Sequence, residues 1–515
     1  MKDGGLKAAV AVLLAALGIL LAGCSPSGTG YVPAPGRFSG AREVVLGGLT
    51  RVSSLNPLYP ADREEEALGR LVFSSLFTLD PRGRLVPDLA TGYSVSPDGL
   101  TYTVTLRQGV DWQHGGAFGP RDVVATFQAV ADPGNHSPFW GVTRDLVTVS
   151  ASGGNQVTFS LAKGDVYFPR DALAQIPIVS ADHLQGWSGG SLAPVGTGPY
   201  LFRGRQGDSW LFAANPGYFG GKPPIARLEY EFFPDAQALA AAVADGEVSF
   251  AAAPLLAVNG SVAKTTNVLR PAVVTILFNT RQAELRDPRV RRAISLGLDR
   301  EQLVQGVLGG QGVPGVTVYP PLPGRRPVAG MTAFDPGQAN KLLTSAGWLP
   351  TGGIRAKDGS LLTLDLLVPT GDPALEETGV VIAGQLEGIG VNVQIEQMDW
   401  GDLVRRAIGG NFGGLLLPLD LTPGLDPEGF VASWAKPPNG NNLGFYRDPG
   451  ADTQLVAAGM GTSGARERLQ QILLQDPPGA FLYYPEETVE TARGLTGYVP
   501  DPYVLYNGVA SWRMR

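Results

Sequence analysis

Residues 361–421 have the sequence LLTLDLLVPTGDPALEETGVVIAGQLEGIGVNVQIEQMDWGDLVRRAIGGNFGGLLLPLDL and alternate between two kinds of hydrophobic pattern. The apolar runs have the length of strands, whereas the segments between them carry apolar residues at the spacing of one helix face. Strands that alternate with helices of this length form βαβ units, which predicts an α/β fold with a largely parallel sheet. The expected order is strand 361–368, helix 373–387, strand 391–397, helix 400–408 and strand 415–421.

The ends of these strands point to a binding site. In parallel sheets ligands bind beyond the carboxyl ends of the strands, which here are 369–371, 399–400 and 419–424. Trp400 and Trp434 flank these ends. Each is therefore a candidate for the wall of a binding site, and the alternative is a place in the core, where we expect most of the other tryptophans.

Helix starts are marked by a recurring signal. An aspartate caps the helix and a proline takes the first helical position at 287–288, 335–336 and 372–373. Asp299, three residues before Gln302, predicts a further helix with a capping-box pattern. The other elements expected from the pattern are the strands 42–50, 102–106 and 157–161 and the helices 64–77 and 120–130.

The N-terminus resembles the signal of an exported lipoprotein. Lys2 and Lys7 precede an apolar run at 8–21, which is too short to cross a bilayer of roughly 30 Å as a helix. LAGC at 21–24 is similar to a lipobox, and Cys24 is the only cysteine. We expect a signal peptide at 1–23, lipidation of Cys24, a flexible tether at 24–41, and an extracytoplasmic protein held at the membrane. The alternatives are a buried thiol for Cys24 and a first strand within the tether.

Composition limits the class of protein. The 515 residues are too many for one core and predict two to four domains, and an apolar fraction of 44% is enough to pack them. With one cysteine the chain can form no internal disulfide. The formal net charge is −7 without a basic block, which argues against binding of nucleic acid.

The sequence contains no clear catalytic or metal motif. His114, His136 and His183 are far apart in the sequence and lack partners at ligand spacing. SVAK at 261–264 matches S-x-x-K without its companion motifs. GQGVPG at 310–315 follows a helix rather than a strand, which indicates a turn instead of a dinucleotide site. We therefore expect a binding protein with no catalytic residue, no metal and no cofactor.

A series of short motifs then runs in one order through residues 42–490. Together they resemble family 5 of the extracellular solute-binding proteins, the peptide/nickel-type receptors of ABC importers. The motifs are PDLA at 87–90, SPDGLTY at 96–102, GTGPY at 196–200, NPGYFGGKP at 215–223, DGEVS at 245–249, FNT at 278–280, RVR at 289–291, DR at 299–300, ANKLLTSAGW at 339–348 and DPEGF at 426–430.

The resemblance implies a fold like that of the periplasmic binding proteins (type II, cluster C). Two lobes joined by a hinge would close on a ligand, which stabilises the closed form as far as it binds that form better. By analogy, lobe I comprises 42–81, 185–275 and 490–515, an extra domain comprises 82–184, and lobe II comprises 276–489.

The resemblance also implies the function and the site. The chain would be a monomeric substrate-binding protein that captures a small solute, first of all a peptide, and delivers it unaltered to an ABC permease and ATPase complex. Asn56 and Asn279 could equally be turn residues, and Asp426 could be a helix cap. The candidate ligand contacts are Leu55 and Asn56 from lobe I, Asn279 near the hinge, and Trp400, Asp420, Asp426 and Trp434 from lobe II.

One departure from the family affects the ligand. Peptide-binding members tend to hold the amino group of the peptide with a carboxylate three residues before Asp-Pro, and here that position is Pro423. Asp420 would have to reach from another backbone point, and a buried ammonium without a counter-ion is costly. The alternatives to a free-amine peptide are a blocked or longer peptide, a metal chelate and a neutral solute. An exported hydrolase on a similar scaffold is a further alternative.

Overall fold

The computed structural model describes residues 43–60, 62–185, 192–254, 256, 263–323, 334–420, 428–435 and 441–515. They belong to one compact unit, Gly40–Arg515. The expected signal peptide at 1–23, the tether at 24–41 with Cys24, and Asp426 and Pro423 lie outside the described residues. Within the described part, no helix has both the length and the apolar character needed to cross a membrane.

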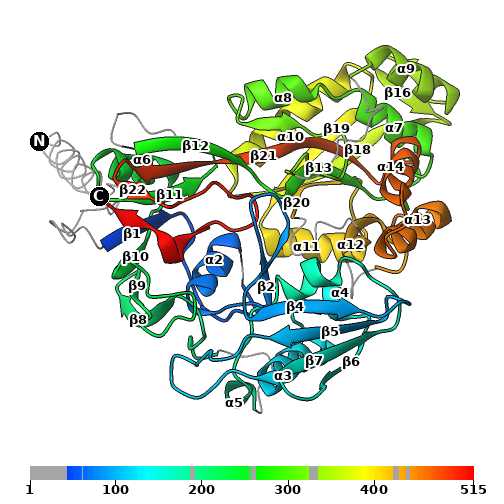
Figure 1. The fold of residues 1–515 in the computed structure, drawn as a ribbon. Helices are drawn as coiled ribbons and strands as arrows, with labels where there is room; N and C mark the ends of the chain where they lie inside the picture. Colours follow the sequence, from blue (N-terminus) through cyan, green and yellow to red (C-terminus); the bar gives the residue numbers. More distant parts are fainter. Residues whose placement is uncertain are drawn as a thin grey trace, which may run out of the picture. The chain divides into compact units, whose positions relative to one another are not determined.

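One long strand, β21 (Gly479–Ala492), joins two halves of a twelve-stranded sheet (Figure 1). On one side of β21 lie the strands of lobe I, and on the other side lie those of lobe II. Lobe I contributes β11 (Phe250–Ala253), β1 (Glu43–Gly48), β10 (Arg227–Phe232), β9 (Ser209–Ala214) and β8 (Tyr200–Gln206), and lobe II contributes β13 (Ala272–Phe278), β20 (Gly414–Asp420), β18 (Thr363–Pro369) and β19 (Asn392–Met398). Two further strands, β12 (Ala263–Leu269) and β14 (Gly312–Pro314), pair with β21 alone.

The hinge consists of two chain segments that run side by side. The first half of β21 pairs with β13, where Val274 lies opposite Tyr483, and its second half pairs with β12, where Leu269 lies opposite Glu486. The backbone N–H of Arg270, between β12 and β13, donates to the carbonyl of Pro485 at 2.9 Å. The two chain segments that connect the lobes are therefore hydrogen-bonded to each other at this point.

At the same two places, the chain passes from one hydrophobic core to another. One core comprises buried residues from 44–268 and 489–512 and includes the extra domain. The buried members of the other two cores all fall within 273–484. These limits lie close to the domain boundaries expected at 275–276 and 489–490, which remain our assignment.

The βαβ units predicted for 361–421 are confirmed. β18 is parallel to both β19 and β20, and the connecting helices are α10 (Pro373–Glu387) and α11 (Trp400–Gly409). The sheet is not largely parallel, however, because β13 and β21 join it in antiparallel pairing. The expectation was wrong there because sequence pattern does not give the direction of strands that are distant in the chain.

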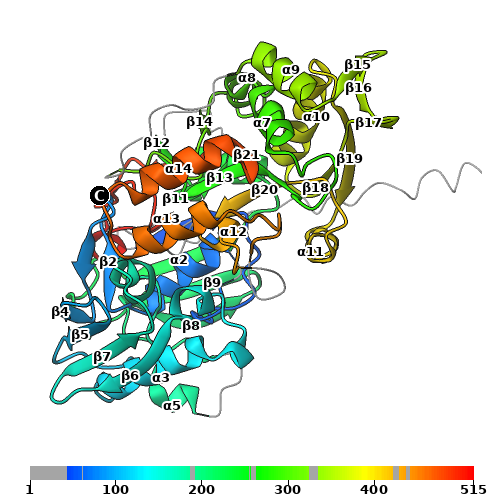
Figure 2. The same cartoon turned by 90° about the vertical axis from the view of Figure 1, so that its right-hand side faces the viewer.

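Helices cover both faces of the lobe II sheet. Its residues alternate between the two cores, since Leu366 faces one and Leu367 the other. The first face carries α7 (Pro288–Leu296), α8 (Arg300–Gly306), α9 (Pro336–Ser345) and α10, and the second carries α11, α12 (Glu428–Val431), α13 (Pro449–Gly459) and α14 (Ala465–Gln475). Figure 2 shows α13 and α14 lying side by side.

The predicted caps are present. The side chains of Asp287, Asp335 and Asp372 each accept a backbone N–H at the start of α7, α9 and α10. Asp299 accepts from the N–H of Gln302 at 3.0 Å and starts α8. A cap satisfies donors that the first turn of a helix leaves unpaired, which is why this signal is local and can be recognised in the sequence.

The extra domain contains a four-stranded antiparallel sheet next to one helix. The strand order is β4 (Ala90–Val95), β5 (Thr101–Leu106), β7 (Gln156–Leu161) and β6 (Leu146–Ala151), and the helix is α3 (Pro120–Ala131). The elements expected at 102–106, 120–130 and 157–161 are therefore confirmed.

The helix expected at 64–77 is shorter, because α2 (Arg63–Val72) ends five residues earlier. The carbonyl of Val72 accepts the N–H of Gly198 at 2.8 Å, so this end of the helix is occupied by the GTGPY turn. A Cβ on Gly196 would lie 2.1 Å from the same carbonyl oxygen. The close approach of the turn to the carbonyl of Val72 explains why the helix ends there. It also explains why residue 196 is a glycine.

The other elements are short. They are β2 (Phe77–Leu79), β3 (Leu85–Pro87), α4 (Trp140–Thr143), α5 (Ala181–Leu184), α6 (Ala236–Ala244), β15 (Leu349–Thr351), β16 (Ile354–Lys357), β17 (Ser360–Leu361), β22 (Leu495–Thr496) and β23 (Arg513–Met514), with 3-10 turns at Pro133–Asn135 and Val509–Ser511 and a π-helical turn at Pro169–Leu173.

Candidate functional site

A recess of about 170 Å³ lies where the parallel strands of lobe I end beside the hinge. β1 is parallel to both β10 and β11, so their carboxyl ends share one edge of the sheet. The lining combines this edge, the first turn of α2 and both hinge segments. It consists of Leu49, Thr50, Asp62, Arg63, Glu64, Ala252, Ala253, Pro254, Arg270, Glu487 and Leu505.

An ion pair between Arg63 and Glu487 connects α2 to the hinge strand β21. Arg63 also donates to the carbonyl of Pro502 at 3.2 Å. Burial by itself lowers the pKa of Arg63, but the carboxylates around it, first of all Glu487 and also Asp420, raise it above its ordinary value. The guanidinium therefore stays charged in a largely enclosed position.

Asp420, a predicted ligand contact, lies at the edge of the lobe II sheet next to the hinge. It is the last residue of β20 and lies opposite Ala272, the first residue of β13, just after the hinge. Its charge acts on Arg63 of lobe I. The carboxyl ends of the parallel strands of both lobes thus meet near the hinge, as expected for a site between them.

Glu64 is a carboxylate with an unusual environment in the same recess. It accepts the backbone N–H of Thr50 at 2.8 Å and the hydroxyl of Tyr230 at 3.0 Å. Burial is the largest effect and raises the pKa of Glu64 to about 7, although these hydrogen bonds oppose it. Glu64 can therefore be either charged or neutral near neutral pH.

The recess offers charges of both signs to a ligand. Arg63 and Arg270 are positive, and Glu64 and Glu487 are negative. The Nε atom of Arg270 is buried and has no hydrogen-bond partner among the described residues. Such a lining can hold a polar ligand with both positive and negative groups.

Trp400 and Trp434 are exposed and do not belong to the core. The exposed fractions of the two residues are 53% and 41%. Trp400 is the first residue of α11 and directly follows the carboxyl end of β19. The ammonium of Lys163, from the extra domain, lies 5.6 Å from the ring centre of Trp434. The position of both side chains fits the predicted wall, and ligand contact stays a prediction.

The extra domain contacts lobe II at a second place, away from the hinge. The N–H of Val166 donates to the carbonyl of Gly459 at 2.7 Å. The guanidinium carbon of Arg466 lies 4.1 Å from the ring centre of Tyr167 in the extra domain and 5.6 Å from that of Tyr319 in lobe II. We call Val166, Tyr167, Gly459, Arg466 and Tyr319 the latch, because they join the extra domain to lobe II.

Leu55 and Asn56 have structural roles here. Leu55 is 5% exposed and packs in the core of lobe I. The side-chain oxygen of Asn56 accepts the N–H of Leu58 at 3.0 Å, which closes a turn. These contacts fit the alternative of a turn residue for Asn56, and ligand contact by either residue stays a prediction.

The expectation that Asn279 lies near the hinge is wrong. β13 begins beside the hinge at Ala272 and runs away from it, and Asn279 follows its far end. The Asn279 amide donates to the carbonyls of Gly410 and Phe412 at 2.9 and 3.0 Å. The residue holds a turn against the start of β20, which is the alternative considered above.

Two histidines that are distant in the sequence are neighbours in space. The rings of His114 and His183 lie 5.1 Å apart, centre to centre. No group of three or more His, Cys, Asp and Glu in the described ranges is placed to hold a metal ion. This pair alone does not make a metal site.

Sequence reasoning missed Arg63, Arg270 and Glu487. One signal was available, because Arg63 places a positive charge in the first turn of a helix, where the macrodipole disfavours it. Residues that are locally unfavourable in this way are common at functional sites. The pairing of Arg63 with a residue 424 positions later in the chain carries no local signal.

Comparisons with known proteins agree with this architecture. The model of the bacterial extracellular solute-binding proteins, family 5 (middle), matches residues 84–442. A probable di/tripeptide-binding protein 5 of Pseudomonas aeruginosa is 31% identical over 82% of this chain and 86% of its own length. The oligopeptide-binding protein AppA of Bacillus subtilis is 26% identical over 97% of each chain.

Solved structures show the same fold. The structure of AppA from Bacillus subtilis, in complex with a nonapeptide, aligns with a TM-score of 0.76 over 92% of this chain and 99% of its own, at 26% identity. NikA from Brucella suis, in complex with Fe(III)-EDTA, aligns with a TM-score of 0.81 over 92% of this chain and all of its own, at 21% identity. The expected two-lobe fold of the periplasmic binding proteins is therefore confirmed, and the chain belongs to family 5 of the bacterial extracellular solute-binding proteins.

Proposed function

We propose that the chain is the substrate-binding protein of an ABC importer and that its ligand is a peptide. The observation that carries this proposal is the meeting of the two carboxyl edges at a hinge, in a family of solute-binding proteins. The relatives named for di/tripeptides and oligopeptides support the peptide as ligand. The chain would act as a monomer and hand the ligand unaltered to the permease and ATPase complex.

The charges around the hinge support a zwitterionic or polar ligand. A peptide has an ammonium and a carboxylate at its ends and amide groups between them. Arg270 and Arg63 are suited to a carboxylate, and Asp420 and Glu64 to a positive group. We propose that Trp400 and Trp434 contact side chains of the ligand, and that Asp426 is a further contact.

Capture would work by closure of the lobes rather than by covalent chemistry. A ligand that contacts both edges favours the closed form by its difference in affinity for the two forms. The latch adds contacts that exist only when the extra domain and lobe II touch. We therefore propose no catalytic residue.

We also propose that Cys24 is lipidated and that the tether at 24–41 leaves the lobes outside the cytoplasm, near the permease. The lipobox resemblance supports it. After expression in a bacterium, the C24A variant should move from the membrane to the soluble fraction, whereas Ser25→Ala should remain. An equal membrane fraction of C24A, or an N-terminal peptide that starts at Met1 without lipid in mass spectrometry, would contradict the proposal.

Ligands that copurify give the direct test of function. The gently purified protein, denatured and analysed by mass spectrometry, should release peptides, and dipeptides to nonapeptides should then be tested for a rise in melting temperature. A nickel–histidine chelate serves as the comparison. If no peptide is released or stabilises the protein, the peptide proposal fails, and stabilisation by the chelate alone would replace it.

The latch predicts a specific effect on affinity. Arg466→Ala should raise Kd for the bound peptide about two- to fivefold, because its cation–π contact with Tyr167 joins the extra domain to lobe II and is worth about 0.5–1 kcal/mol. Titration calorimetry measures this effect. Arg205→Ala is the matched control, because the Arg205 guanidinium carbon lies 4.7 Å from the Trp210 ring centre within lobe I. Equal affinities of wild type and R466A would remove the latch from the mechanism.

Glu64 predicts a dependence of stability on pH. Its pKa of about 7 in the folded state lies above the ordinary 4.5, so folding favours the protonated form. Its stabilising contribution is fully present below about pH 4.5 and is lost as the pH rises through 7, by roughly 3 kcal/mol at most. Glu64→Gln should therefore reduce the loss of stability between pH 5 and 8 in urea unfolding of the ligand-free protein.

Glu247→Gln is the control for this experiment, because Glu247 is an exposed glutamate of lobe I. Asp88 and Asp501 keep part of the pH dependence in every variant, since burial raises the pKa of each to about 6. The assignment to Glu64 fails if E64Q and wild type lose stability in parallel.

A further inference from the structure

A second recess, of about 480 Å³, lies in lobe II at the end remote from the hinge. β13 starts beside the hinge and ends at Phe278, and the N–H of Thr280 then donates to the carbonyl of Gly444 at 2.9 Å. This bond brings 279–286 beside 444–447. The recess is lined by Thr280, Arg281, Arg286, Pro288, Arg291, Phe445, Tyr446, Arg447 and Asp476.

Three exposed arginines give this recess a positive charge. In the described part of the chain, no carboxylate lies within ion-pairing distance of Arg281, Arg286 or Arg447. The guanidinium carbon of Arg281 lies 3.7 Å from the ring centre of Phe445, which holds it in place. Arg286 donates to the backbone carbonyl of Arg281 at 3.4 Å.

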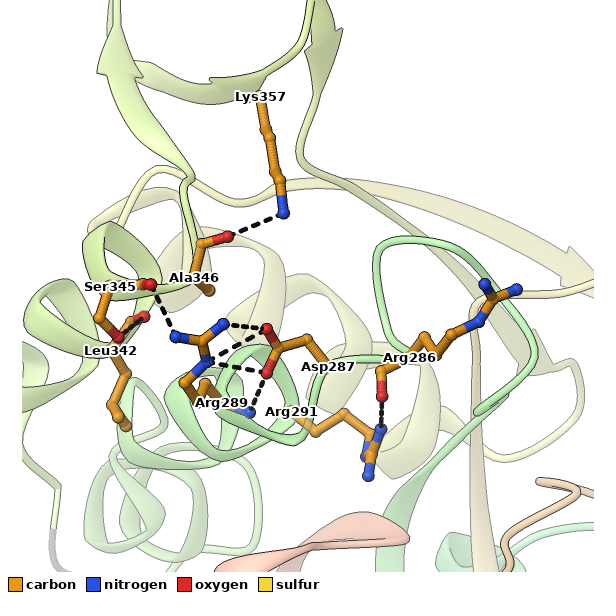
Figure 3. A network of polar contacts seen from close by, with 8 residues as sticks. All are labelled: Arg286, Asp287, Arg289, Arg291, Leu342, Ser345, Ala346 and Lys357. Atoms are coloured by element: carbon orange, nitrogen blue, oxygen red, sulfur yellow. Dashed lines mark hydrogen bonds and ion pairs between the residues drawn. The ribbon is translucent and has the colours of Figure 1, made fainter.

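Two of the neighbouring acidic residues are already paired with other arginines. Asp287 faces Arg289, with 2.6 Å between their closest atoms, whereas the Arg286 side chain extends away from it (Figure 3). Asp476 is the one carboxylate in the lining, and it forms an ion pair with the buried Arg291. Arg291 is fixed in turn by the carbonyls of the chain, including that of Pro477 at 2.8 Å.

Tyr446 belongs to the lining of the recess, and its buried hydroxyl lacks an acceptor among the described residues. Tyr446 is 1% exposed, and its hydroxyl has no hydrogen-bond partner among the described residues. Burial is the main reason that the pKa of Tyr446 is raised, and the nearby Asp476 raises it further, so the hydroxyl stays protonated. A buried hydroxyl without a partner is unfavourable, and a bound acceptor that reaches it would remove that cost.

We propose that this recess binds a phosphate group, as a free phosphate or phosphate ester or as the headgroup of an anionic phospholipid. Guanidinium groups match the geometry of phosphate oxygens and bind them with two hydrogen bonds each. The guanidinium groups that would bind the phosphate belong to Arg281, Arg286 and Arg447. The hydroxyl of Tyr446 would be a further donor. The volume leaves room for a group attached to the phosphate. The proposal is independent of the ligand bound between the lobes.

Binding of inorganic phosphate to the full-length chain tests the site. Phosphate should raise the melting temperature in a saturable way, beyond the effect of chloride at matched ionic strength. The double variant R281Q/R447Q should bind at least about tenfold more weakly. Arg205→Gln is the control, because it removes an arginine that also stacks on an aromatic ring but lies in lobe I.

Tyr446→Phe separates binding from folding. Loss of an unpartnered hydroxyl should leave the stability of the phosphate-free protein unchanged or higher, while the affinity for phosphate falls about tenfold. Equal phosphate affinity in wild type, Y446F and R281Q/R447Q would overturn the proposal. So would the lack of any saturable phosphate effect in the wild type together with no preference for anionic vesicles.

Vesicles distinguish the two sources of phosphate. Vesicles of phosphatidylcholine with phosphatidylglycerol should retain more wild type than R281Q/R447Q if the ligand is a headgroup, and both proteins carry the same N-terminus. Equal retention together with phosphate binding assigns the site to a free phosphate or ester. A response to polyglutamate alone, without phosphate or vesicle binding, would overturn the proposal in favour of an acidic protein surface.

Discussion

The strand β21 is the constraint on which the arrangement of the lobes depends. Its first half is hydrogen-bonded to β13 and its second half to β11 and β12, so the strand is fixed in register in both lobes. The lobes cannot slide along it without breaking one set of these bonds. Pro485, which has no N–H to donate, lies where the pairing changes. Bending near this residue is therefore the motion that leaves both halves of the sheet intact.

This constraint also explains why charged residues gather at the hinge. The strand crosses from one core to the other, and its side chains there cannot all enter an apolar interior. Glu487 is buried at 6% exposure and needs a counter-ion, which Arg63 supplies from α2. Because Asp420 acts on the same guanidinium from lobe II, a change in the angle between the lobes changes the field around Arg63. Charge and bending are thus coupled at one place.

The sequence predicted what depends on local pattern. The βαβ units and the aspartate caps are encoded within a few residues, and they were found. The predictions that were wrong concern features that depend on contacts between residues distant in the chain. α2 was expected to continue because Leu76 keeps the helical spacing, but the carbonyl of Val72 is taken by the turn at 196–200. Asn279 was expected near the hinge because it lies only a few residues after the boundary assigned at 275–276, but β13 carries the chain away from the hinge before Asn279.

The grouping of arginines in the second recess has an energetic cost. The whole chain has a formal net charge of −7, yet Arg281, Arg286 and Arg447 line one recess without a carboxylate partner in the described ranges. Like charges at this spacing repel one another, and a buried hydroxyl beside them adds a further cost. Among the described residues, an aromatic ring holds Arg281 but neither Arg286 nor Arg447, so ring packing does not account for those two exposed guanidinium groups. Structures retain such costs where a bound partner offsets them, and an anion in the recess offsets both at once.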